Sequence, residues 1–133
     1  MTKLVGITGG IGSGKTTFSN HLKKLGFVVH ESDTVVSEIY NNPKKQFLSF
    51  IKEKISQDAV FRSKINKAEI ANVIFSNNKI KKLLERRIHK EVQISRVAFI
   101  KKYTKKKKKI IFADIPLLFE NKLEKKFDLV VCI

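Results

Sequence analysis

Cysteine, arginine and acidic residues are all scarce in this sequence, and each shortage limits what the protein can be. Cys132 is the one cysteine in 133 residues, so a disulfide within the chain is excluded, as expected for a reducing compartment. No apolar run is long enough to span a membrane, and the first residues lack the charged and then apolar segments of a secretory signal. We therefore expect a cytoplasmic protein without a membrane partner. Cys132 lies in an apolar, strand-like run, so we expect it to be buried and inert.

The shortage of acidic residues gives the chain a strong positive charge. Twelve Asp and Glu stand against 28 Lys and Arg, a formal net charge of +16, and nearly all of the excess is lysine. A nucleic-acid reader usually relies on arginine, whose forked guanidinium matches phosphates and guanine edges. We attribute the charge first to compositional bias and second to anionic small ligands, and we do not expect nucleic acid as a partner. The unbroken lysine run 105–109 is expected to be a solvated connector.

Glycine is scarce as well, yet four of the six glycines fall at positions 9, 10, 12 and 14. Residues 9–16 read GGIGSGKT, a complete G-x-x-x-x-G-K-[ST] phosphate-binding loop. The apolar run 3–8 precedes it as a buried strand and residues 16–25 follow as a helix, which is the context that this motif requires. The pattern predicts that the chain binds a nucleoside triphosphate.

The loop also assigns roles to single residues. Backbone N–H groups would surround the phosphates, and the start of the helix adds positive potential. Lys15 would reach the β- and γ-phosphates, and the hydroxyl of Thr16 would bind Mg²⁺. The expected nucleotide-binding residues are Gly10, Ile11, Gly12, Ser13, Gly14, Lys15, Thr16 and Thr17.

Strands that alternate with helices predict an α/β fold with a parallel sheet. The expected strands are residues 3–8, 27–30, 110–113 and 127–133. The further expected helices are residues 34–40, 44–56, 67–75 and 79–101. This run of helices is too long for one crossover, so we expect a nucleotide-binding core made of 1–33 and 103–133, with an inserted helical region from 34 to 102.

Ligands of open parallel sheets bind at the C-terminal ends of the strands, where Gly9, Asp33, Asp114 and Pro116 all lie. A carboxylate at Asp33 could accept the proton of an attacking hydroxyl group. Asp33 or its neighbour Ser32 could equally cap the next helix, and the residue pattern leaves both interpretations open. Asp114 could likewise hold Mg²⁺ through water or only end its strand.

Three segments together resemble dephospho-CoA kinases: residues 8–16, the acidic pair Glu31 and Asp33, and residues 114–120, which read DIPLLFE. The resemblance extends from residue 1 to residue 133. It implies a three-layer fold of the P-loop NTPase type, in which the helical region binds the acceptor. It also implies ATP-dependent phosphorylation of the ribose 3′-hydroxyl of dephospho-CoA, the last step of coenzyme A synthesis, with ATP and Mg²⁺ as cofactors.

The resemblance implies site residues by position. Asp33 would be the general base and Lys15 would neutralise the transferring group, so these two are the expected catalytic residues. Thr16 and Asp114 would bind Mg²⁺. The expected acceptor-binding residues are Asp33, Lys67, His89, Pro116 and Leu117.

The sequence departs from the family pattern in several places. Glu31 replaces an aspartate, Lys90 replaces a proline, and Lys67 stands where many members have arginine, so a bidentate phosphate contact would become a point-charge contact. Family members also continue past the fourth strand with an arginine-bearing lid helix and a fifth strand, so the sequence resembles a truncated member. Two alternatives therefore stay open: another P-loop nucleoside or nucleotide kinase, and a catalytically impaired fragment that binds nucleotides or nucleic acid.

Overall fold

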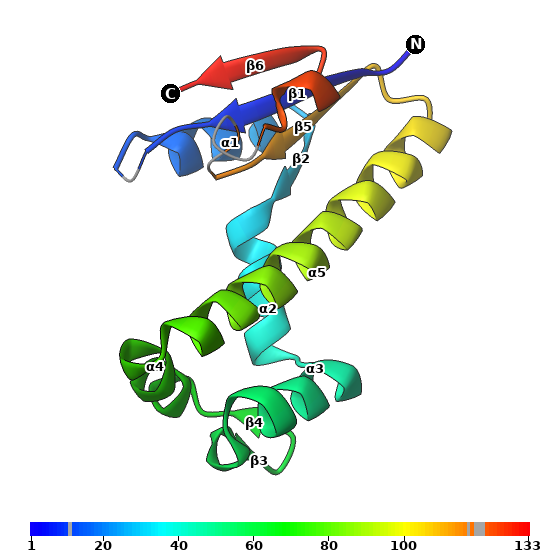
Figure 1. The fold of residues 1–133 in the computed structure, drawn as a ribbon. Coiled ribbons are helices and arrows are strands. Elements are labelled where there is room, and N and C mark those ends of the chain that lie inside the picture. Colours follow the sequence, from blue (N-terminus) through cyan, green and yellow to red (C-terminus); the bar gives the residue numbers. More distant parts are fainter. Residues whose placement is uncertain (11, 117, 119–121) are drawn as a thin grey trace. The chain divides into compact units, whose positions relative to one another are not determined.

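The structure, a computed structural model, describes residues 1–10, 12–116, 118 and 122–133 (Figure 1). The chain divides into two compact units. The first unit is Met1–Ser32 with Ile94–Ile133, and it contains a four-stranded sheet. The second unit, Asp33–Gln93, contains helices and a two-stranded hairpin. That residues 1–33 and 103–133 form a nucleotide-binding core, and that residues 34–102 form an inserted region that binds the acceptor, stay predictions.

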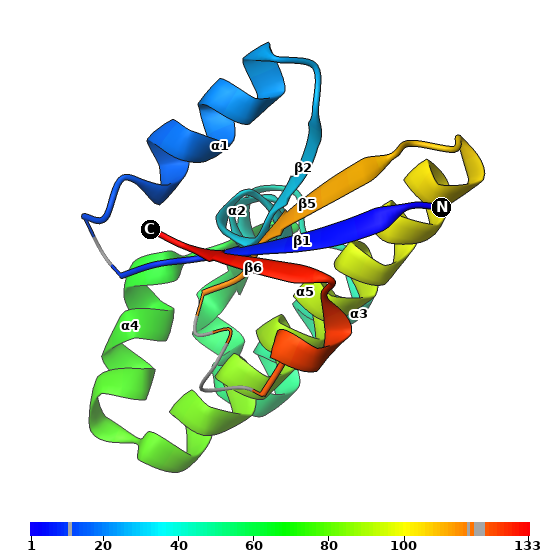
Figure 2. The ribbon, with the colours of Figure 1, turned by 90° about the horizontal axis from the view of Figure 1, so that it is seen from above.

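The sheet of the first unit is parallel throughout, with strand order β2-β5-β1-β6. Its strands are β1 (Lys3–Thr8), β2 (Val28–Glu31), β5 (Ile110–Asp114) and β6 (Leu129–Cys132). Figure 2 shows the four strands side by side. All four strands lie where the sequence predicted strands, within about two residues at each end, and the predicted α/β class with a parallel sheet is confirmed.

Alternate residues of the central strands feed two separate cores, one for each face of the sheet. On one face, Val5, Ile7 and Phe112 pack with Leu22 of helix α1 (Lys15–Lys24). On the other face, Ala113 packs with Ile115, Leu118 and Leu123, close to the short 3₁₀ helix η3 (Glu124–Lys126). The two central strands are therefore buried from both sides, and β1 is the buried strand that the apolar run 3–8 predicted.

Helix α1 ends at Lys24, one residue before the end of the helix predicted over 16–25, and Gly26 follows its C-cap residue Leu25. This glycine has a φ of 92°, a conformation that other residues rarely adopt. The N–H of Gly26 donates to the carbonyl of Lys23, and the N–H of Phe27 donates to the carbonyl of Leu22. These two bonds form a Schellman motif, which turns the chain directly into β2.

Helix α5 (Asn78–Lys105) runs through both units, and its residues from Ile94 onward belong to the first. There the Nε2 atom of His30, on β2, lies 3.1 Å from the Oγ atom of Ser95. The ring of His30 also packs edge-on against Phe99, with centroids 5.3 Å apart. Burial, and then the charge of Arg96, lower the pKa of His30 to about 4, so the ring is neutral near pH 7. His30 is thus a structural residue that joins α5 to the sheet.

The second unit consists of five helical segments, the hairpin and the first half of α5. The segments are α2 (Ser32–Asn41), α3 (Lys45–Phe50), the π-helix η1 (Ile51–Ile55), the 3₁₀ helix η2 (Gln57–Ala59) and α4 (Lys67–Ser76). Their shared core is Phe47, Ile51, Ile55, Ala59, Ile70 and Leu84. Asn66 caps α4 by accepting a hydrogen bond from the N–H of Glu69.

Two features of the second unit differ from the sequence prediction. The single α-helix predicted over residues 44–56 becomes π-helical at Ile51, so its last turn is wider than apolar periodicity can reveal. The hairpin of β3 (Val60–Phe61) and β4 (Lys64–Ile65) was not predicted. Its two turn residues, Arg62 and Ser63, have φ values of 50° and 62°, a turn that glycine or asparagine normally signals.

The prediction that Cys132 is buried is wrong. Cys132 is exposed, because β6 is the outer strand of the described sheet and leaves one flank to solvent. The lysine run 105–109 is exposed throughout, as predicted for a connector. In the described part of the chain, no helix combines the length and the apolar character needed to cross a bilayer.

Candidate functional site

The glycine loop joins the end of β1 to the start of α1, with Gly14 as the N-cap residue of that helix. Gly12 and Gly14 have φ values of 76° and 88°, in the left-handed region that L-amino acids with side chains rarely adopt. A Cβ atom added at either position would meet no other atom within 4 Å. The backbone conformation, and not crowding, is therefore what requires glycine here. The predicted binding residue Ile11 lies outside the described residues.

The first turn of α1 has the features of an anion-binding site. Gly14 has no side chain to cap the helix, and the first turn contains no acidic residue. The N–H groups of Lys15, Thr16 and Thr17 are therefore first-turn donors without an i−4 partner inside the helix. Together with the helix dipole, such donors form a binding site for phosphate. Within the described residues, the buried hydroxyl of Ser13 also has no hydrogen-bond partner.

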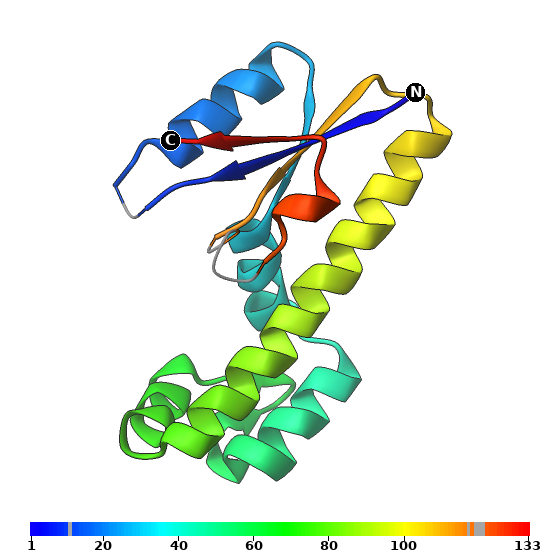
Figure 3. The same ribbon diagram turned by 45° about the horizontal axis from the view of Figure 1, so that its top comes forward.

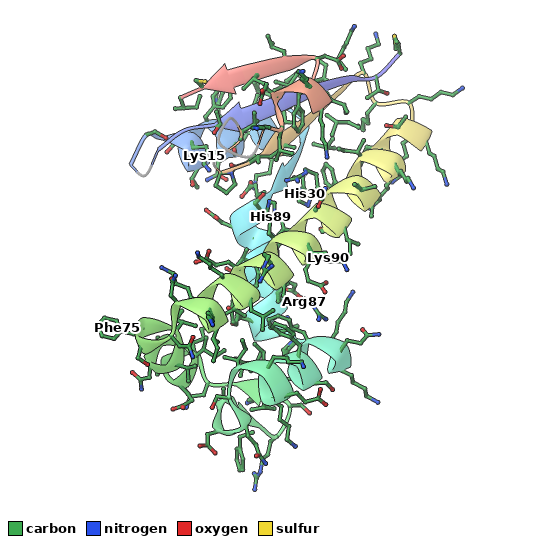
Figure 4. The ribbon with its side chains drawn as sticks, viewed as in Figure 1. Lys15, His30, Phe75, Arg87, His89 and Lys90 are labelled. Atoms are coloured by element: carbon green, nitrogen blue, oxygen red, sulfur yellow. The ribbon has the colours of Figure 1, made fainter. Side chains whose placement is uncertain are left out.

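Lys15 is joined to the sheet by an ion pair. Its Nζ atom lies 2.8 Å from the Oδ1 atom of Asp114, the last residue of β5, and the two side chains are 12% and 6% exposed. The backbone carbonyl of Asp114 accepts a hydrogen bond of 2.7 Å from the Oγ atom of Ser32. These two contacts link the start of α1 to the C-terminal ends of β2 and β5. Lys15 is labelled in Figure 4. The structure brings two predicted site residues, Lys15 and Asp114, into direct contact.

The donors present fit a magnesium ion that is held partly by a nucleotide. Thr16 offers an exposed hydroxyl in the first turn of α1, and Asp114 offers a carboxylate beside Lys15. Mg²⁺ in phosphoryl-transfer sites usually keeps waters and uses only one or two protein ligands besides the phosphates. Among the described residues, no group of three or more His, Cys, Asp or Glu could hold a metal ion. The described residues alone therefore do not form a complete metal cage.

Asp33 lies in the second unit, directly after Ser32, and it is exposed. It is the second residue of α2, so the expectation that Asp33 or Ser32 caps this helix is wrong. The hydroxyl of Ser32 instead donates to the carbonyl of Asp114, and the helix begins at Ser32 itself. A carboxylate in the first turn stabilises the helix through its dipole.

The other predicted acceptor residues of the second unit are Lys67 and His89. Lys67 begins α4, and its Nζ atom lies 3.3 Å from the Oδ1 atom of Asn41 and 5.7 Å from the ring centroid of Tyr40. Burial raises the pKa of Tyr40, so its hydroxyl stays neutral beside the ammonium group. His89 is exposed on α5 (Figure 4).

The remaining predicted residues follow β5. Pro116 is exposed in a turn after the strand, and Leu117 lies outside the described residues. The sequence did not indicate that Ser32 would bind Asp114 or that Asn41 would bind Lys67. No motif could signal these contacts, since each joins a polar residue to a partner far along the chain.

Comparison with known proteins gives consistent matches along the chain. The family model described as "Dephospho-CoA kinase" matches residues 3–133. The dephospho-CoA kinase of Bartonella quintana is 34% identical over 131 residues, which are 98% of this chain and 66% of that protein. The dephospho-CoA kinase of Streptococcus pneumoniae serotype 4 is 32% identical over 121 residues, which are 91% of this chain and 60% of that protein. The chain thus spans about 60 to 66% of the length of these curated relatives.

A solved structure supports the fold in particular. The dephospho-CoA kinase from Campylobacter jejuni superposes with a TM-score of 0.76 at 23% sequence identity, covering 98% of this chain and 66% of that one. At this identity the likeness concerns the fold alone. It confirms the predicted α/β fold of the P-loop NTPase type.

Proposed function

Since the chain belongs to the dephospho-CoA kinase family, we propose that it transfers the γ-phosphoryl group of ATP to the ribose 3′-hydroxyl of dephospho-CoA. The products are coenzyme A and ADP, and the reaction takes place in the cytoplasm. The observation that carries this proposal is the glycine loop between β1 and α1, where the ammonium group of Lys15 is held against Asp114. The relatives are longer than this chain, so the statement that this chain has their complete activity is part of the proposal.

Lys15 and the first turn of α1 bind and polarise the phosphates. The N–H groups of Thr16 and Thr17 would donate to phosphate oxygens, and the ammonium group of Lys15 would balance the charge on the transferring group. Lys15 must then exchange at least part of its contact with Asp114 for the phosphate oxygens. Thr16 and Asp114 are the protein groups that would hold Mg²⁺, which would supply neutralisation of the phosphate charge.

Asp33 would orient the acceptor. In this proposal its exposed carboxylate accepts the proton of the 3′-hydroxyl as that oxygen attacks phosphorus in line with the leaving ADP. The second unit would hold the rest of dephospho-CoA, with Lys67 as a point-charge contact to phosphate and His89 nearby in the acceptor site. Pro116 and Leu117 would complete the acceptor contacts from the segment after β5.

The direct test measures ADP release by the purified chain with ATP, Mg²⁺ and dephospho-CoA, and detects coenzyme A by chromatography. We expect formation of coenzyme A that depends on dephospho-CoA and is abolished by Lys15→Ala. Lys52→Ala, which removes an exposed lysine of η1, serves as the matched control and should leave the rate unchanged.

The choice of acceptor separates this proposal from its alternatives. Adenosine and nucleoside monophosphates are offered in parallel, and faster phosphorylation of any of them would assign the chain to another class of P-loop kinase. ATP binding without transfer to any acceptor, in the chain and in a version extended to the length of its relatives, would reduce the proposal to nucleotide binding.

A further inference from the structure

Seven lysines lie within nine residues at the end of α5 and in its connection to β5. All seven are exposed, and no acidic residue occurs between positions 97 and 113. We name this surface the lysine patch: Lys101, Lys102, Lys105, Lys106, Lys107, Lys108 and Lys109. The glycine loop and the ion pair described above use none of these residues.

The lysine patch lies at the N-terminal ends of the central strands. The carbonyl of Lys109 accepts a hydrogen bond of 2.8 Å from the N–H of Lys3, and the carbonyl of Lys108 accepts one of 2.7 Å from the hydroxyl of Thr2. Figure 3 shows the N-terminus beside the link from α5 to β5. Because β1 and β5 are parallel, this edge of the sheet is opposite to the one that carries the glycine loop. A partner at the patch would therefore leave the nucleotide site open.

An apolar hollow adjoins the patch. It has a volume of about 600 Å³, and its apolar lining comes from Met1, Leu4 and Ile100, with Lys107, Lys108 and Lys109 at the same hollow. The side chain of Met1 is fully exposed. The carboxylate of Asp128 lies near this edge, where it accepts a hydrogen bond of 2.7 Å from the N–H of Leu4. The surface thus combines dense positive charge with the exposed side chain of Met1 and the partly buried Leu4 and Ile100.

We propose that the lysine patch docks on the surface of an anionic lipid bilayer. Lysine carries a compact charge on a long apolar stem, which suits a diffuse layer of lipid phosphates at the boundary with acyl chains. Clusters of four to eight basic residues bind such surfaces electrostatically, and exposed apolar side chains add a second contribution. Peripheral docking needs no membrane-spanning helix. Such docking would revise two expectations from the sequence: that the lysine run 105–109 is only a solvated connector, and that the protein has no membrane partner.

Nucleic acid is the competing polyanion, and the patch lacks the groups that would favour it. The patch contains no arginine to form bidentate contacts. Its nearest aromatic residue, Tyr103, is half-buried, with the ammonium groups of Lys102 and Lys106 at 5.2 and 5.4 Å from its ring centroid. The ring is therefore not free to stack on bases as single-strand binders require.

The test is flotation with vesicles of phosphatidylcholine alone or mixed with phosphatidylglycerol. We expect the chain to bind only the mixed vesicles and to dissociate at high salt. Replacing residues 105–109 with glutamine should weaken binding by more than about tenfold, because each lysine near an anionic surface contributes several-fold. The matched control replaces five exposed lysines of the second unit with glutamine and should bind nearly as well as the original chain. Those lysines are Lys44, Lys45, Lys52, Lys54 and Lys64.

Each other result would overturn the proposal. Equal loss in the two variants would show that only net charge matters. Failure to bind mixed vesicles would show that the lysine patch is not a membrane-docking surface. Tighter binding to random duplex DNA at the same salt concentration would assign the patch to nucleic acid. Circular dichroism and the ATP affinity of both variants verify that they are folded, and neither readout depends on the patch.

Discussion

The ammonium group of Lys15 and the carboxylate of Asp114 form a nearly buried ion pair of 2.8 Å between the first residue of α1 and the last residue of β5. Lys15 is thus held by a negative charge, and phosphates must compete with that charge. Asp114→Asn removes the competitor. We expect ATP without Mg²⁺ to bind several-fold more tightly to this variant, measured by calorimetry, whereas phosphoryl transfer with Mg²⁺ falls. Weaker binding of Mg²⁺-free ATP would contradict the competition.

The same substitution also tests the contribution of the pair to stability. Asp114→Asn leaves the ammonium group of Lys15 without its charge partner in a site that is 12% exposed, and the free energy of unfolding should fall by about 3 kcal/mol. Glu91→Gln is the control, because its pair with Arg87 is 28% and 29% exposed and should contribute only about 0.5 kcal/mol. Urea denaturation measures both. A loss no larger than that of the control would mean that solvent screens the Lys15 pair.

Asp33→Asn separates binding from proton transfer. The amide keeps the size of the side chain but cannot accept the proton of the acceptor hydroxyl, so kcat should fall by about 10²–10⁴. ATP affinity should change little, since the first turn of α1 and Lys15 are untouched. Steady-state kinetics with dephospho-CoA and calorimetry with ATP measure the two effects. Asp58→Asn, at another exposed aspartate of the second unit, is the control, and normal turnover of Asp33→Asn would exclude the role of a base.

The parts of this structure that the sequence predicted are those encoded by contiguous patterns. The glycine loop, the four strands and helix α1 each depend on neighbouring residues. The contacts that assemble the site were beyond such patterns. Ser32 and Asp114 are 82 positions apart, and a serine before an aspartate resembles a helix cap equally well. The tight turn at Arg62 and Ser63 was likewise not predicted, because neither residue type signals a positive φ.

Gly14→Ala tests the backbone of the loop. Alanine at a φ of 88° is strained although its Cβ would meet no atom within 4 Å, so the free energy of unfolding should fall by about 1 kcal/mol. Gly10→Ala is the matched control: its surroundings are equally open, and Gly10 is not among the glycines with positive φ. Thermal denaturation compares the two. Equal destabilisation would show that crowding or a different loop conformation, and not the φ of Gly14, decides the cost.

His30 predicts how stability depends on pH. The pKa of His30 is lowered from 6.5 to about 4 in the folded chain, so between these values the unfolded chain binds a proton that the folded chain does not. The stabilisation is complete above pH 6.5 and is lost as the pH falls towards 4, by up to about 3 kcal/mol. His30→Gln retains a polar partner for Ser95 but has no titrating ring, and it should remove this slope. Urea denaturation at a series of pH values compares the two chains, and an unchanged slope in His30→Gln would assign the pH dependence to other groups.

Replacement of residues 105–109 with glutamine should not affect catalysis. These lysines are exposed at the edge of the sheet opposite to the glycine loop, so neither substrate would contact them. We expect the KM values for ATP and dephospho-CoA to stay within about twofold of those of the original chain at physiological salt, where charges beyond a Debye length of about 8 Å are screened. Lowering the salt concentration should reveal a modest rise in both KM values, because the lysines then contribute to the field that steers anions. A large rise for dephospho-CoA alone would place the run in the acceptor site.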